Sequence, residues 1–133
     1  MPLTLEIVTP EKRALTVTCD EVRLTGVAGQ FGIRPGYTPL VAALAGGELA
    51  YDAGGTTHRF VAGEGFAEVS DDRVRVLVEE VLPADQVDPQ RAAKELAESR
   101  KRLETMKPGD PAYELERAHL ERAAARALVA GRR

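Results

Sequence analysis

The sequence is poor in the residue types on which most catalytic sites depend. Its 133 residues include one cysteine, two histidines, no tryptophan, three tyrosines and three phenylalanines. A single cysteine, Cys19, excludes an internal disulfide and indicates a reducing compartment. Neither His58 nor His119 lies near Cys19 in the sequence. Because a catalytic thiol needs an activating partner, we interpret Cys19 as a structural or incidental thiol.

Other catalytic and metal-binding patterns are also missing. The only serines are Ser70 and Ser99, and neither lies in a nucleophile elbow. The segment Gly63-Glu64-Gly65 is too short for a dinucleotide-binding fingerprint. His58 has no second histidine or cysteine near it, and Asp71-Asp72 is usual turn chemistry. We therefore expect no catalytic residue, no metal ligand and no required cofactor.

Long apolar runs are missing as well. No stretch approaches the roughly 18 apolar residues that a membrane-spanning helix needs. Residues 1–6 lack the charged start and the apolar core of a signal peptide. We expect neither a membrane span nor a secretion signal.

Charge and glycine divide the chain into two parts. Residues 1–84 carry 12 acidic and 7 basic side chains, whereas residues 85–133 carry 9 acidic and 11 basic ones. Ten of the twelve glycines and five of the six aromatic residues precede residue 85. This change in composition predicts a first domain over residues 1–84 and a second over 85–133.

The first part shows the period-two alternation of half-buried strands. The strands that we expect lie at residues 3–8, 14–19, 21–24, 41–44, 48–51, 56–61, 66–69 and 73–78. Glycine or aspartate turns separate most of them, at a spacing of about 8–12 residues. This pattern predicts an antiparallel β-sandwich or barrel of eight to ten strands that acts as a binding module.

The second part is predicted to be an antiparallel two-helix hairpin. Asp88-Pro89 and Asp110-Pro111 each place a capping residue before a proline at the first helical position. We expect helices at about 88–106 and 111–130, joined by Lys107-Pro108-Gly109. Their apolar stripes are Ala92, Leu96, Leu103 and Met106 on the first and Leu115, Ala118, Ala125, Leu128 and Val129 on the second. Alanine buries little area, so the hairpin is expected to be weakly held.

Basic residues are frequent on the hairpin. They are Arg100, Lys101, Arg102, Arg117, Arg122, Arg126, Arg132 and Arg133. Such a run is consistent with a solvated helix face or with a recognition surface. Tyr113 is the only aromatic residue in the second part of the chain, and the whole protein has a net negative charge. An acidic protein surface is therefore a better partner than nucleic acid.

The segment Gly29–Leu40, GQFGIRPGYTPL, is the most distinctive stretch of the chain. Three glycines and two prolines within twelve residues indicate a shaped backbone. Taken alone, this composition is typical of a loop with a few anchoring side chains. The order of residues resembles the Gly-x-Phe/Leu-Gly-Ile-x-Pro-Gly-His-Ala/Thr-Pro-Leu segment of the epsilon subunit of F-type ATP synthases. Tyr37 stands where that family commonly has histidine, and Gln30 where it often has an acidic residue.

A second local match lies at the start of the first predicted helix. Val87-Asp88-Pro89-Gln90-Arg91-Ala92 is similar to the Ile/Leu-Asp-x-x-Arg-Ala motif with which some bacterial epsilon subunits bind ATP. The resemblance implies a regulatory ATP site at Asp88, Arg91 and Ala92, with Arg102 and Arg117 supplying further charge. The alternative is a plain helix cap followed by a solvated arginine.

The resemblance covers nearly the whole chain and implies a non-catalytic subunit in the central stalk of the rotary ATP synthase. The sandwich would bind the gamma subunit and lie on the ring of c subunits. The hairpin would switch between a folded form on the sandwich and an extended form along gamma, whose basic helix contacts acidic segments of the beta subunits and blocks ATP hydrolysis. The alpha and beta subunits are thus further implied partners. The implied location is peripheral, on the cytoplasmic face of the plasma membrane. The interface residues that we predict are Gln30, Phe31, Gly32, Ile33, Pro35, Gly36, Tyr37, Pro39, Leu40, Arg100, Arg122 and Arg126. The competing interpretations are a stand-alone nucleotide-sensing adaptor and a free-standing sandwich enzyme or ligand-binding protein.

Overall fold

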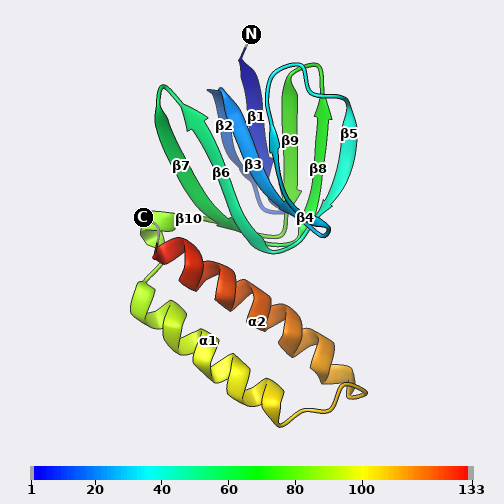
Figure 1. Ribbon diagram of the computed structural model, residues 1–133, viewed down its shortest axis with the longest axis vertical. Helices are drawn as coiled ribbons and strands as arrows, with labels where there is room; N and C mark the ends of the chain where they lie inside the picture. The colour runs from blue at the N-terminus through cyan, green and yellow to red at the C-terminus, as the bar shows by residue number, and fades with distance from the viewer. Residues whose placement is uncertain (1, 132–133) are drawn as a thin grey trace.

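The computed structural model describes residues 2–131, as a rolled β-sheet with two helices packed beneath one end (Figure 1). The strands are β1 (Leu3–Val8), β2 (Arg13–Cys19), β3 (Glu21–Gly26), β4 (Gly29–Ile33), β5 (Leu40–Leu44), β6 (Gly47–Ala53), β7 (Thr56–Ala62), β8 (Gly65–Ser70), β9 (Arg73–Val78) and β10 (Val81–Pro83). A short 3₁₀ turn, η1 (Ala84–Gln86), leads to α1 (Pro89–Glu104) and α2 (Pro111–Ala130). The predicted fold class, a β-sandwich followed by a helical hairpin, is confirmed.

The strands form one continuous sheet that curls into a near-barrel. Its order is β10-β7-β6-β3-β5-β8-β9-β1-β2, with β4 paired to β3 beside this path. Every pairing is antiparallel except the parallel contact between β1 and β9. Leu3, Leu5 and Ile7 of β1 point inward and are fully buried, as the alternation predicts. The two ends of the sheet, β2 and β10, are not paired to each other.

Two of the observed strands, β4 and β10, were not predicted from the sequence. Strand β4 occupies the first half of the segment expected to be a loop, because Gly29–Ile33 pairs with Val22–Gly26 of β3. Its glycines hide the alternation, although Phe31 and Ile33 both point toward the core cluster of the sandwich. Strand β10 is only three residues long, too short for a visible period.

The helices begin where the capping residues predict. One side-chain oxygen of Asp88 accepts from the amides of Gln90 at 3.0 Å and Arg91 at 3.3 Å, and Asp110 accepts from the amide of Ala112 at 2.9 Å. Helix α1 ends at Glu104, two residues before the expected end, and α2 matches its expected range.

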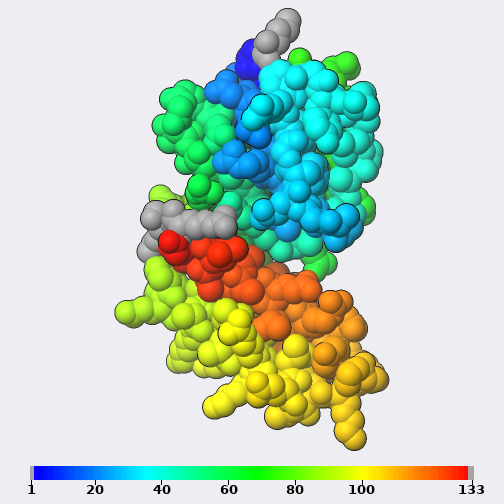
Figure 2. All heavy atoms as spheres, in the orientation of Figure 1, coloured from blue at the N-terminus to red at the C-terminus, as the bar shows by residue number. Residues whose placement is uncertain are grey.

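The hairpin contacts the sandwich through a small apolar cluster of its own. Its buried members are Val61, Ala84, Val87, Ala92, Ala125, Val129 and Ala130. Figure 2 shows the two helices, yellow to red, as a block beneath the sandwich, with α2 against it. The predicted stripe on α2 is partly wrong, because Leu115 is 75 % and Leu128 is 52 % exposed. The sequence could not reveal this, since α2 faces both α1 and the sandwich and therefore has no single buried face.

A polar contact, and not only alanine, holds the two helices together. Ser99 of α1 is fully buried, and its hydroxyl donates to Oε1 of Glu116 on α2 at 2.7 Å. Nε of Arg102 donates to the same oxygen at 3.0 Å. These bonds lower the pKa of the Glu116 carboxyl, the Ser99 bond most of all.

Candidate docking and nucleotide sites

The loop of the predicted interface segment, residues 34–39, forms a rigid tip at the end of the barrel opposite the helices, whereas strand β4 runs up to this tip from the helix end (Figure 1). The amide of Gly36 donates to Oδ1 of Asp72 at 2.6 Å, and the amide of Tyr37 donates to the carbonyl of Arg34 at 3.2 Å. Gly36 has φ +84°, a conformation that favours glycine. Asp72 therefore ties the β8–β9 turn to the tip, a contact between distant segments that the sequence could not show.

The members of this segment differ in exposure. Gln30, Gly32, Pro35, Gly36, Tyr37 and Pro39 are exposed, whereas Phe31 and Leu40 are partly buried. Ile33 is 0 % exposed, because it pairs with Val22 and packs in the sandwich core. The expectation that Ile33 presents an apolar side chain to a partner is wrong, since alternation along β4 turns it inward.

Electrostatic contacts fix the strands beside this segment. Arg23 of β3 donates two hydrogen bonds to the carboxylate of Asp52 on β6, at 2.7 and 3.1 Å, and Thr57 donates a third at 2.6 Å. The Arg23 bond is the main cause that lowers the pKa of the Asp52 carboxyl to about 2, followed by the Thr57 bond. This pairing holds β3, and with it β4, in register with β6.

An exposed apolar patch on the outer face of the sandwich was not predicted. It consists of Val27 (72 % exposed), Val41 (73 %), Phe66 (58 %) and Leu77 (37 %). Phe66 lies directly opposite Leu77 on β9 and Ala43 on β5, and the amide of Val27 donates to the carbonyl of Ala43 at 3.1 Å. The sequence of β8 does contain a signal for this patch. Successive side chains of a strand point to opposite faces, so Phe66 must point outward if Ala67 and Val69 point inward. Exposed apolar patches of this kind mark interaction sites.

The predicted nucleotide residues are only partly brought together. Asp88, Arg91 and Ala92 line a cavity of about 270 Å³ with Glu95 and Arg126. Nε of Arg91 donates to Glu95 at 3.1 Å, and Arg126 lies 3.6 Å from the other oxygen of Glu95. The capping bonds use only Oδ1 of Asp88, so Oδ2 can accept from a ligand while the cap stays intact.

Arg102 and Arg117 do not reach this cavity. Arg102 is eleven residues beyond Arg91, about 16 Å along a helix, and pairs with Glu116. Arg117 pairs with Glu114 and Glu121 on its own helix. Their placement in the nucleotide site is wrong, and Arg126 takes the position that they were expected to fill, because the antiparallel hairpin brings the end of α2 beside the start of α1.

The arginines predicted to face a partner do not share one surface. Arg100 is exposed, but Arg122 packs over Gly46 and Arg126 donates to Glu80 of the sandwich at 2.9 Å. In this folded arrangement, Arg122 and Arg126 contact the sandwich and are only partly exposed.

Cys19 lies away from these sites, and its thiol is buried beside Asp20 and Asp52. Burial raises the pKa of the Cys19 thiol to about 11, and the two carboxylates add to the rise. At pH 8 about one thiol in a thousand is then ionised. We expect the folded protein to react with a thiol reagent such as DTNB at least about a hundredfold more slowly than the urea-unfolded chain. Equal rates would show that Cys19 is accessible.

The described residues contain no group of histidine, cysteine, aspartate and glutamate that could hold a metal ion. No helix within residues 2–131 is both long and apolar enough to cross a membrane.

Comparison with known proteins identifies the family. A family model described as "ATP synthase, Delta/Epsilon chain, beta-sandwich domain" matches residues 2–84. The ATP synthase epsilon chain of Anaeromyxobacter sp. (strain K) is 46 % identical over 132 residues, covering 99 % of this chain and all of that protein. The ATP synthase epsilon chain of Geobacter sp. (strain M21) is 40 % identical over 130 residues, covering 98 % and 94 % of the two chains. The chain belongs to the ATP synthase epsilon-chain family. The resemblance found in the sequence is thus confirmed.

Solved structures show the same fold as this epsilon-family chain. A chain in the cryo-EM structure of Euglena gracilis mitochondrial ATP synthase, OSCP/F1/c-ring in rotational state 1, matches with a TM-score of 0.86 at 24 % identity, covering 99 % of this chain and 82 % of that one. A chain in the central stalk/c-ring structure of Tetrahymena thermophila mitochondrial ATP synthase matches with a TM-score of 0.67 at 12 % identity, covering 98 % and 97 %.

Proposed function

We propose that this chain is a non-catalytic subunit in the central stalk of a proton-translocating F-type ATP synthase, coupling the rotor to the catalytic head. The observation that carries the proposal is full-length similarity to bacterial epsilon chains, which includes the hairpin and not only the sandwich. The chain would lie on the cytoplasmic face of the plasma membrane, attached only through the complex.

The sandwich offers two surfaces for assembly. The rigid tip, held by the bond between Gly36 and Asp72, is suited to the c-subunit ring, since it projects from the end of the barrel away from the helices. The apolar patch around Phe66 is suited to the gamma subunit, because a continuous apolar surface stabilises a lasting contact.

The hairpin is proposed to switch between this folded form and an extended form that contacts the alpha and beta subunits and inhibits ATP hydrolysis. Its contact with the sandwich is small and alanine-rich, and Arg126 adds one partly exposed ion pair to Glu80, which contributes little in water. A contact of this strength can separate without unfolding the sandwich, whose core cluster is distinct. Extension would also release Arg122 and Arg126 toward acidic surfaces of the head.

ATP is proposed to favour the folded form by binding in the cavity at the start of α1. Arg91 and Arg126 come from different helices, so a phosphate group that pairs with both would link α1 to α2. ATP shifts the switch only through its higher affinity for the folded form. Inhibition would therefore ease as ATP rises.

Calorimetry on the isolated chain tests this site. We expect Arg91→Ala to weaken ATP binding by about tenfold, which is about 1.4 kcal/mol. Arg100→Ala is the matched control, because it removes an exposed arginine from the same helix, about 14 Å from Arg91 along the helix axis, and should leave the affinity unchanged. Absence of heat at millimolar ATP, or equal losses in the two variants, would argue against the cavity as a nucleotide site.

Co-purification tests the proposed function as a whole. A tagged chain isolated from gently solubilised membranes should bring down the alpha, beta and gamma subunits in fixed ratio. A stand-alone nucleotide-sensing adaptor, the second candidate, would appear as a monomer in the soluble fraction. The cavity at Asp88 and Arg91 is compatible with both functions, whereas the apolar patch around Phe66 favours the stalk subunit, since a solitary protein gains nothing from it.

A further inference from the structure

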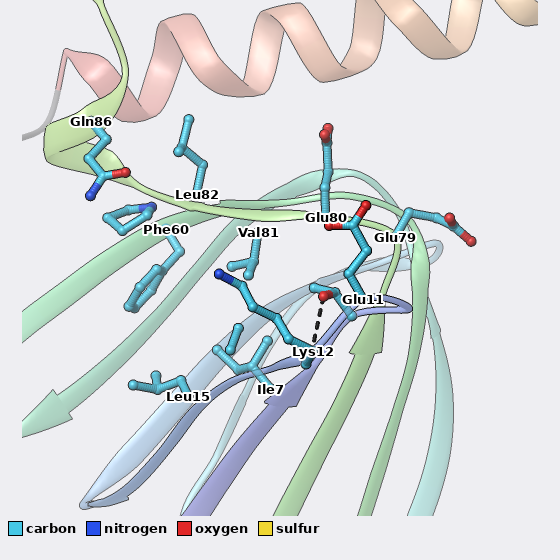
Figure 3. Close-up of a pocket in the computed structure, with 13 residues that line it drawn as sticks. Ile7, Glu11, Lys12, Leu15, Phe60, Glu79, Glu80, Val81, Leu82 and Gln86 are labelled. Atoms are coloured by element: carbon cyan, nitrogen blue, oxygen red, sulfur yellow. Dashed lines mark hydrogen bonds between the residues drawn. The ribbon is translucent and has the colours of Figure 1, made fainter.

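A cavity of the sandwich lies where the rolled sheet does not close. It has a volume of about 700 Å³ and runs between the β1–β2 hairpin on one side and β7 and β10 on the other (Figure 3). Among residues 2–131, strand β2 pairs only with β1, and β10 pairs only with β7. Both strands therefore turn an edge of backbone donors and acceptors toward the same gap.

The core is incompletely covered along this gap. Val74 and Val76, on β9, which is paired on both edges, are 0 % exposed. Leu15 of β2, opposite fully buried Ile7, and Val81 of β10 pack against the same core but remain partly exposed. These side chains lack the covering that a further strand would give them.

The rim of the groove is acidic. Glu11, Glu79 and Glu80 lie at one end of it, and Lys12 is the only basic residue in its lining (Figure 3). Arg126 pairs with Glu80, but within residues 2–131 neither Glu11 nor Glu79 forms an ion pair. A basic side chain at this end would find two carboxylates ready to accept from it.

At the other end the gap is closed. The amide of Asp20 donates to the carbonyl of Asp52 at 2.7 Å, joining the β2–β3 turn to β6. The groove is thus closed at the Asp20 end, and Ala14, Leu15 and Lys12 of the β1–β2 hairpin lie in its lining.

We infer that this groove receives an extended segment of another ATP synthase subunit, which adds a strand to the edge of β2. About five residues, an ordinary strand length, would lie against β2 and β10. Alternate apolar side chains would cover Leu15, Phe60 and Val81, and a lysine or arginine would pair with Glu11 and Glu79. The inference rests on the proposed function, because the segment comes from a neighbour in that complex.

Amide hydrogen exchange, measured on residues 13–19 in the free chain and in the purified synthase, tests the backbone part of the inference. We expect the amides that point away from β1 to exchange at least about tenfold more slowly in the complex, because they gain acceptors. Unchanged exchange in a complex that does contain the chain would overturn the inference and leave the proposed function standing. Failure of the chain to co-purify would overturn both.

Photo-crosslinking in the same complex identifies the occupant. Benzoylphenylalanine in place of Leu15 should label a short segment of another subunit, whereas the same probe in place of Thr16, the next residue and outward-facing, should not label it. Labelling only of Phe60 or Val81 in the same chain, or of a second copy of the chain, would overturn the inference.

Charge reversal tests the basic contact. Glu79→Lys should lower the yield of the Leu15 crosslink by about tenfold, as expected for a charge-assisted contact that is lost. Glu64→Lys is the matched control, because the carbonyl of Glu64 accepts from the amide of Glu79 at 3.1 Å but its side chain does not line the groove. Equal yields in the two variants would overturn the assignment of a basic residue to the occupant.

Discussion

Removal of residues 88–133 is expected to raise ATP hydrolysis by the assembled synthase several-fold without loss of assembly. The sandwich keeps its own core, because the cluster beneath the hairpin shares no buried residue with the cluster inside the barrel. Truncation exposes Val61, Ala84 and Leu82, a cost of a few kcal/mol at about 25 cal/mol per Å². The measurement compares the hydrolysis rates of membranes carrying the full-length and truncated chains at equal subunit content.

A full-length variant with the hairpin locked on the sandwich distinguishes two explanations for the higher hydrolysis rate: absence of the helices, and inability of the helices to extend. A β-carbon added at Gly46 would lie 3.4 Å from Cγ of Arg122. A cysteine at residue 122 would place its sulfur near this γ position, so we choose cysteines at these two positions to form a disulfide. Under oxidising conditions, Gly46→Cys with Arg122→Cys should hold the hairpin folded and reproduce the high hydrolysis rate of the truncation. Reduction should restore inhibition, and Gly46→Cys alone is the control. Low hydrolysis in the oxidised double variant would show that inhibition does not require the hairpin to leave the sandwich.

The strands and helices that could be predicted from the sequence are those whose signals lie within their own residues. Strands β1, β3, β8 and β9 carry their period-two pattern in their own residues, and each helix begins at an aspartate–proline pair that caps it. Strand β4 was missed because Gly29 and Gly32 carry no side chain to continue the pattern, and its pairing with β3 is visible only once the chain has folded. Which strands become neighbours is likewise a property of the whole sheet: β1 pairs in parallel with β9, about seventy residues later.

The candidate sites were predicted less well because exposure and convergence are tertiary properties. Ile33 was predicted to be an interface residue because it lies within the Gly29–Leu40 motif beside exposed residues. The alternation along β4 instead directs its side chain into the core. Charge alone grouped Arg102 and Arg117 with Arg91, whereas the hairpin's antiparallel arrangement selects Arg126. Phe66 was recognised as a strand residue but not as a surface one, although the inward positions of Ala67 and Val69 already fix its direction.

Phe66→Asp is expected to prevent stable assembly while leaving the isolated chain folded. Phe66 is 58 % exposed on the outer face of β8, so the new carboxylate stays in water in the free protein. In the complex the same carboxylate would be buried against an apolar partner surface without a counter-charge. We expect a loss of about 2 kcal/mol or more, roughly thirtyfold in affinity for the gamma subunit, measured by titration of gamma with the purified chain.

Two further aspartate substitutions show whether position, and not charge alone, decides the outcome. Leu115→Asp places a carboxylate at a residue that is 75 % exposed on α2, away from the patch, and should leave both stability and gamma affinity unchanged. Ile33→Asp buries a carboxylate in the sandwich core and should cost about 4 kcal/mol or more, so the isolated chain should lose its cooperative thermal transition. A folded Phe66→Asp chain that binds gamma with wild-type affinity would remove the patch from the interface. Because Ile33→Asp loses assembly by unfolding and Phe66→Asp by docking alone, only the thermal transition of the free chains tells the two losses apart.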